Sequence, residues 1–137
     1  MDAAPAPLNP SDRRMTLDAS GVFREWGKGL EAVYGYRAEE VIGRRPDFLI
    51  PPVLREKHWE GFNKAVATGR MKRTDGRFTS VGVHKDGHLV PTRAIDVLNF
   101  GPDGKVESVT GTVIAQGPKW AGKLLGAALA PLKLMQR

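Results

Sequence analysis

Two Asp-Gly pairs set between apolar runs constrain the fold of this chain most strongly. The turn Lys85-Asp86-Gly87 separates residues 77–84 from residues 89–100, and Pro102-Asp103-Gly104 separates the latter from residues 106–115. Asp-Gly turns between apolar segments are typical of β-hairpins. The second half of the chain is therefore predicted to form a three-stranded antiparallel meander.

The first half predicts a hairpin, short helices and one longer helix. Residues 15–18 and 22–26 flank a turn in which Gly21 can adopt a positive φ, and apolar residues recur at helical spacing within residues 30–34. Pro52 suits the first turn of a helix that ends at Thr68, because Gly69 follows as a C-terminal stop. The expected order is two strands, short helices, a long helix and three strands.

Two segments flank this core, which is expected to span residues 15–117. Residues 1–14 contain three prolines and no periodic apolar pattern, which predicts a flexible arm. Residues 118–137 carry four basic side chains and no acid, and they predict an amphipathic helix that Pro131 breaks or kinks. This helix is expected to pack on the sheet or to pair with a second subunit, with binding to a membrane surface as the alternative. Its apolar stretch is too short to span a bilayer.

Composition excludes several classes of function. The 137 residues suit one domain, and the lack of cysteine rules out disulfides, thiolate metal sites and cysteine nucleophiles. The N-terminus lacks the pattern of a secretory signal, so a cytoplasmic protein is expected. The net charge of +6 is concentrated in the last twenty residues and is not interleaved with aromatics, so nucleic acid is not an expected partner. No enzyme motif is present, and the chain is not expected to be an enzyme.

The element order and several short motifs resemble the PAS family. The likeness is carried by Asp18-Ala-Ser-Gly21, Tyr34-Gly-Tyr36, Glu39-Glu-Val-Ile-Gly43, Ala67-Thr-Gly69, Lys85-Asp-Gly87 and Pro91. The resemblance implies an α+β domain in which a five-stranded antiparallel sheet carries short helices and one longer helix on one face. The C-terminal amphipathic helix would be added to this fold.

His58 is the candidate site residue that the helical spacing singles out. Leu54, His58, Phe62 and Val66 are four residues apart, so they stack along one apolar face of the long helix. His58 is therefore expected to point into the core, where an imidazole without a partner costs about 1–3 kcal/mol. The partner could be a backbone carbonyl, Asp96 or a metal ion.

Within the PAS family, the chain is most similar to haem-binding oxygen sensors of the FixL type. Pro51-Pro52, Arg55-Glu56-Lys57-His58 and the spacing from His58 to residues 85–87 carry this likeness. It implies haem b with iron ligated by His58, a diatomic gas (O₂, CO or NO) at the open position, and signalling through a homodimer or a partner protein. The expected cofactor-binding residues are His58, Phe62, Lys64, Lys72, Arg77, Ala94 and Asp96. The alternative is a cofactor-free PAS module for protein association.

Two positions stay open at this point. The family's gas-binding arginine falls at Phe78, so a one-residue bulge would be needed to bring Arg77 into the pocket. Apolar alternation turns Ile95 and Val97 inward, whereas the resemblance turns Thr92, Ala94 and Asp96 inward. In the second register Asp96 is a buried carboxylate beside the pocket.

Overall fold

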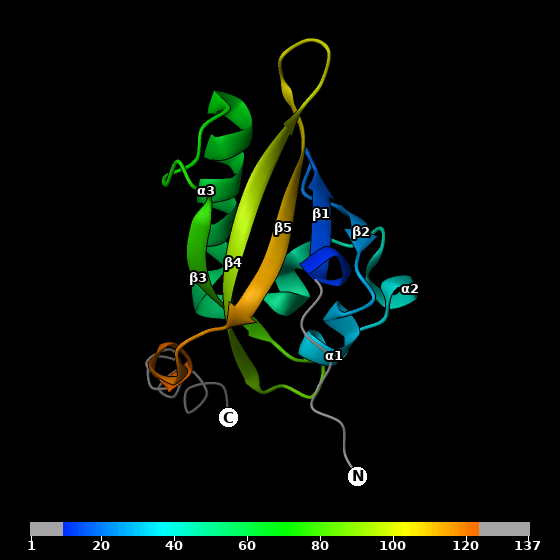
Figure 1. Ribbon diagram of the computed structural model, residues 1–137, viewed down its shortest axis with the longest axis vertical. Coiled ribbons are helices and arrows are strands. Elements are labelled where there is room, and N and C mark those ends of the chain that lie inside the picture. Colours follow the sequence, from blue (N-terminus) through cyan, green and yellow to red (C-terminus); the bar gives the residue numbers. More distant parts are fainter. Residues whose placement is uncertain (1–9, 124–137) are drawn as a thin grey trace.

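A computed structural model describes residues 10–123, and its centre is a five-stranded antiparallel sheet (Figure 1). The spatial order of the strands is β2-β1-β5-β4-β3. Their bounds are β1 Arg14–Asp18, β2 Phe23–Trp26, β3 Arg77–Val83, β4 Leu89–Phe100 and β5 Val106–Gln116. The two Asp-Gly turns join β3 to β4 and β4 to β5, so the predicted meander is confirmed.

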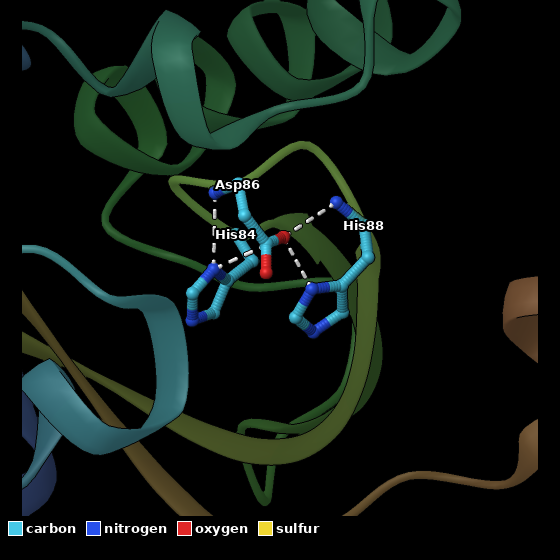
Figure 2. Close-up of side chains that lie close together, drawn as sticks. All are labelled: His84, Asp86 and His88. Atoms are coloured by element: carbon cyan, nitrogen blue, oxygen red, sulfur yellow. Dashed lines mark hydrogen bonds and ion pairs between the residues drawn. The ribbon is translucent and has the colours of Figure 1, made fainter.

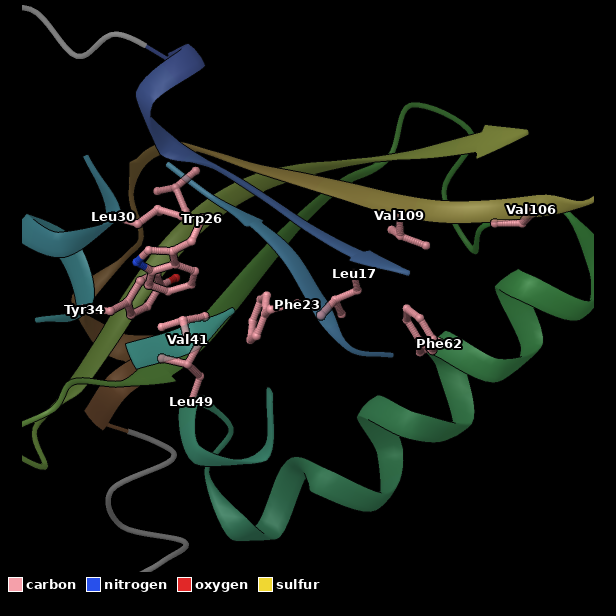
Figure 3. Close-up of a cluster of buried hydrophobic side chains, with 11 residues drawn as sticks. Leu17, Phe23, Trp26, Leu30, Tyr34, Val41, Leu49, Phe62, Val106 and Val109 are labelled. Atoms are coloured by element: carbon pink, nitrogen blue, oxygen red, sulfur yellow. The ribbon is translucent and has the colours of Figure 1, made fainter. Parts of the chain in front are cut away.

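The helices between β2 and β3 pack on one face of this sheet (Figures 1 and 3). The α-helices are α1 Leu30–Tyr34, α2 Ala38–Val41 and α3 Arg55–Thr68; the 3-10 helices are η1 Pro10–Arg13, η2 Pro46–Leu49 and η3 Pro52–Leu54. The long helix ends as predicted, because Gly69 adopts a left-handed conformation with φ of 68°. Its α-helical part begins at Arg55 rather than at Pro52, and η3 occupies the first turn.

The hydrophobic core lies between the helices and the inner face of the sheet (Figure 3). Phe23 is 1% exposed, while Leu30 and Val41 are completely buried. The Phe23 ring meets Trp26 edge-on at 5.4 Å between centroids and lies 6.2 Å from Phe48. Phe23 therefore joins the first hairpin to the short helices, which fixes one end of the domain.

The N-terminal half of α3 is held by Trp59 and Arg55. The Trp59 indole donates to Asp47 Oδ1 at 2.9 Å, and Arg55 Nε lies 3.1 Å from the carbonyl oxygens of both Asp47 and Ile50. Gly21, with φ of 87°, makes room for the Trp59 ring, since a Cβ there would lie 2.5 Å from it. These contacts place the face of α3 that carries His58 above the sheet.

The register of β4 follows the resemblance and not the apolar alternation. Thr92 and Ala94 are 2% and 6% exposed on the inner face, whereas Val97 is 52% exposed. Asp96 pairs with Gly111 of β5, so both belong to the inner face. The alternative register, in which Ile95 and Val97 turn inward, is wrong, because strand pairing sets the face and these apolar side chains lie outside.

The two flanking segments are described in part. Asp12 O of η1 accepts one hydrogen bond, from Gly29 N at 2.7 Å, which ties η1 to the segment before α1, and residues 1–9 lie outside the described part. Residues 119–123 are helical, while residues 124–137 of the predicted amphipathic helix also lie outside it. None of the helices within residues 10–123 combines the length and apolar character that crossing a membrane requires.

Candidate ligand-binding cavity

Two adjoining cavities lie between α3 and the inner face of the sheet. One, called the outer cavity, is lined in part by residues of the segment 64–77 and has a volume of about 1520 Å³. The other, called the inner cavity, has a volume of about 810 Å³. The residues that line both are Lys57, His58, Phe62, Phe78, Thr79, Ala94, Asp96 and Val109. Ligand sites in proteins commonly measure about 300–1,000 Å³, so even the inner cavity alone has the size for a small organic molecule.

The outer cavity is strongly cationic. Its basic lining side chains are Lys57, Lys64, Arg70, Lys72, Arg73, Arg77 and Arg93, against the single acid Asp96. Arg73 is paired with Asp75 at 2.9 Å outside the lining, which reduces its contribution. The remaining cations give this outer cavity, the mouth of the site, a positive potential that attracts anions.

The inner cavity is mainly apolar. Its apolar side chains come from every layer of the domain and include Leu17, Phe23, Leu49, Leu54, Val81, Val113 and Trp120. Trp120 and Ala121 belong to the helical turn after β5, so the wall of this cavity includes the segment that leads out of the sheet. An apolar body would be desolvated here.

His58 lies on the wall common to both cavities, as the helical spacing predicts. Its ring is stacked on Phe62 at 6.2 Å and meets Trp59 edge-on at 4.9 Å. Burial lowers the pKa of His58 below its usual value of 6.5, an effect that the charge of Asp47 only partly opposes. His58 Nδ1 is buried without a hydrogen-bond partner in the described part of the chain, so a neutral imidazole presents an unused polar atom.

Asp96 is the second titratable group on the common wall. Two glycines make room for it: a Cβ at Gly111 would lie 2.9 Å from Asp96 Oδ1, and one at Gly76 only 2.2 Å from the Asp96 carbonyl oxygen. Asp96 N donates to the Gly76 carbonyl at 2.9 Å, which fixes the strand locally. Desolvation by burial raises the pKa of Asp96 to about 6 from 3.8. The carboxyl group thus titrates near physiological pH.

The other residues expected at a site take different places around the cavities. Lys64, Lys72 and Arg77 line the outer cavity only, whereas Phe62 and Ala94 line both. The pairing of β3 with β4 shows no bulge, so Phe78 shares the inner face with Ala94, and Arg77 lies opposite Ile95. The bulge that would have brought Arg77 inward is absent from this strand pair.

Sequence reasoning missed part of the lining. Lys57, Arg70 and Arg93 add charge to the mouth, and Trp120 lines the inner cavity. The basic run over residues 70–77 was the available signal for the mouth. The position of Trp120 could not be predicted, because no sequence pattern relates the segment after β5 to the cavity.

The fold is shared with solved PAS and light-oxygen-voltage (LOV) structures, although no protein-family model matches the chain. A PAS domain from Colwellia psychrerythraea aligns with a TM-score of 0.61 and 25% identity over 77% of this chain and 89% of that one. A LOV domain studied with a flavin analogue gives 0.62 and 21% over 84% of each chain. The N-terminal domain of a Marinobacter aquaeolei diguanylate cyclase with a PAS/PAC sensor gives 0.59 and 20% over 74% and 92%. The chain therefore has the PAS fold.

These comparisons overturn the expectation of haem b. The similar solved structures include LOV domains, one of them studied with a flavin analogue and another described as a blue-light photoreceptor, and they give no support for haem. The haem prediction depended on the FixL likeness around His58. Of what that likeness implied, only the PAS fold is confirmed. The physical reason is that a PAS scaffold and an inward histidine do not by themselves select iron. Gas binding required that iron, so it is not part of the proposed function.

The residues here do not fit the flavin photochemistry of a cysteinyl adduct either. The chain contains no cysteine, so a thiol adduct cannot form. No asparagine or glutamine lines either cavity within residues 10–123, although amides match the alternating donors and acceptors of a flavin edge. The lining described within residues 10–123 therefore does not match a flavin edge.

Proposed function

We propose that this PAS domain is a sensor that binds an organic anion with an apolar body in the two adjoining cavities. The apolar body would occupy the inner cavity and the acidic group would face the cations of the mouth. The role is binding and signalling, without a catalytic step. The observation that carries the proposal is the wall that Lys57, His58 and Asp96 share between a cationic and an apolar cavity.

The polar groups of the common wall give such a ligand its orientation. A neutral His58 can accept a hydrogen bond at Nδ1, or donate one in the other tautomer. Leaving this atom without a partner costs about 1–3 kcal/mol, and a ligand hydroxyl or amide would remove that cost only if the ring turns, because Nδ1 is enclosed in this conformation. The Asp96 carboxylate would accept a hydrogen bond from a donor group of the ligand, because its own negative charge repels the acidic group of the ligand.

The wall of the inner cavity offers a route to the output. Trp120 lines the cavity, and Gly122 of the same helical turn lies against Pro91, since a Cβ there would be 3.2 Å from the proline ring. A ligand that displaces Trp120 would move the segment that follows β5. The signal would pass to a second copy of the chain or to a partner protein, with the exposed Val97 on the outer face of the sheet as a contact.

A matched pair of fluorescent probes tests the ligand class. 8-Anilinonaphthalene-1-sulfonate has an aromatic body and one negative charge, and N-phenyl-1-naphthylamine has a similar body without the charge. We expect the sulfonate to bind saturably with about tenfold higher affinity at low salt, because mouth cations attract it. The difference should shrink toward 1 M salt, where the Debye length falls to about 3 Å.

The same titration tests whether the basic side chains of the outer cavity contribute to binding of the anionic probe. A Lys64→Glu variant should weaken binding of the sulfonate and leave the amine unchanged, while Lys28→Glu, in the segment between β2 and α1 that lines neither cavity, serves as the charge-matched control. Equal affinity for both probes in the wild-type protein would contradict the proposed anion selectivity.

A further inference from the structure

Two of the three histidines of the chain lie outside the cavities, on the turn between β3 and β4. His84, Asp86 and His88 occupy alternate positions of this turn, and Figure 2 shows the Asp86 carboxylate between the two imidazole rings. The rings are stacked with centroids 4.4 Å apart and an interplanar angle of 20°. The sequence contains a His-x-Asp-x-His spacing over residues 84–88.

The backbone of the turn fixes the arrangement. His84 N donates to the His88 carbonyl at 2.8 Å, and Gly87 N donates to the His84 carbonyl at 2.8 Å, with Gly87 at φ of 99°. The two histidines therefore lie opposite each other at the end of the ladder, with Asp86 at the tip. His84 is also seated on α1, because a Cβ at Gly35 would lie 2.5 Å from its ring.

Three potential metal ligands lie close together on this turn. One nitrogen from each imidazole and one Asp86 oxygen all lie within 4.8 Å of one another. Asp86 Oδ1 lies 3.2 Å from His84 Nδ1 and contacts His88 Nδ1 more closely. A tetrahedral zinc site with bonds of about 2.0–2.1 Å separates its ligand atoms by about 3.3 Å, which the 3.2 Å between Asp86 Oδ1 and His84 Nδ1 matches.

The electrostatics of the turn favour a cation. His84 Nδ1 accepts a hydrogen bond from Asp86 N at 3.1 Å, so this nitrogen is unprotonated, and a bound cation would replace the N–H as the partner of its lone pair. The neighbouring Lys85 does not fill this role, because its ammonium group pairs with Glu40 of α2. His84 is 22% exposed at its side chain, whereas Asp86 and His88 are open to solvent, which leaves room for a metal-bound water.

We propose that His84, Asp86 and His88 form a binding site for a divalent first-row metal ion, with Zn²⁺ as the reference metal. Two imidazoles and one carboxylate suit zinc, with water as the fourth ligand. The ion would cross-link the β3–β4 turn itself, which is held to the end of α1 by the hydrogen bond from Lys85 N to the Tyr34 carbonyl at 2.9 Å. This site is separate from the proposed ligand cavity, because none of its three residues lines either cavity.

Calorimetric titration of the tag-free protein with zinc chloride tests this site. We expect one Zn²⁺ per chain for the wild type, and an affinity lowered about tenfold or more in His84→Ala and in His88→Ala, since even outer-shell partners of a metal are worth 10–100-fold. His58→Ala is the matched control, because it removes the third histidine and leaves the turn unchanged. Imidazole NMR signals of His84 and His88 should shift on saturation, while those of His58 stay in place.

The proposal has clear contrary outcomes. Absence of saturable zinc uptake by the wild type at millimolar concentration would overturn it. Wild-type affinity in the His88→Ala variant, which changes an exposed side chain and should fold normally, would overturn it as well. An equal loss in His58→Ala would place the zinc elsewhere and reject the turn as the site.

Discussion

A Phe23→Ala variant is expected to lose about 3–5 kcal/mol of the free energy of unfolding. Phe23 is 1% exposed and contacts Trp26 and Phe48 with its ring, so the substitution leaves a cavity at the junction of the first hairpin and the short helices. Domains of this size have about 5–15 kcal/mol of stability in total. The loss is therefore a large fraction of what holds the fold together.

Urea unfolding followed by tryptophan fluorescence measures this loss. Phe100→Ala is the matched control, because it removes the same ring from a side chain that is 54% exposed, and it should cost less than about 1 kcal/mol. A Phe23→Ala protein as stable as Phe100→Ala would show that the core is not organised around Phe23.

An Asp96→Asn variant is expected to change how stability depends on pH. In the folded protein, burial raises the pKa of Asp96 to about 6, compared with 3.8 for a free carboxyl group. The folded state thus holds the proton more tightly than the unfolded state, and wild-type stability should fall as pH rises from about 4 to about 6 and then level off. The difference corresponds to about 3 kcal/mol.

Asparagine cannot ionise, so this loss should disappear in the variant. Asp96→Asn should be more stable than the wild type above pH 7, by up to about 3 kcal/mol, and their difference should vanish near pH 4. Asp103→Asn on the exposed β4–β5 turn is the control and should keep the wild-type profile. Parallel profiles for the wild type and Asp96→Asn between pH 4 and 7 would mean that Asp96 is not desolvated.

Local chemistry made much of the fold predictable. The two Asp-Gly turns specified the meander, and Gly69 specified the end of α3, because each depends on backbone conformations that few other residues adopt. The face of β4 was not predictable from apolar alternation. Ile95 and Val97 look like core residues, but pairing with β5 places Asp96 over Gly111 on the inner face, and that pairing spans residues far apart in sequence.

The candidate site was predictable only where a helix supplied the geometry. The four-residue spacing along α3 gave the direction of His58, whereas the identity of its ligand depended on resemblance and was wrong for haem. The cationic mouth combines α3, the following loop and β4, and Trp120 reaches the inner cavity from beyond β5. Such convergence depends on tertiary packing and has no periodic signal in the sequence.

The most direct test of the proposed cavity site compares two Phe substitutions on the same strand. Ala94 is buried on the wall common to both cavities, and Val97 is exposed on the opposite face. With 8-anilinonaphthalene-1-sulfonate as the probe and near-ultraviolet circular dichroism to verify folding, Ala94→Phe should abolish saturable binding and Val97→Phe should retain it. Undiminished binding by a folded Ala94→Phe protein would contradict the proposal that the cavity beneath α3 is the ligand site.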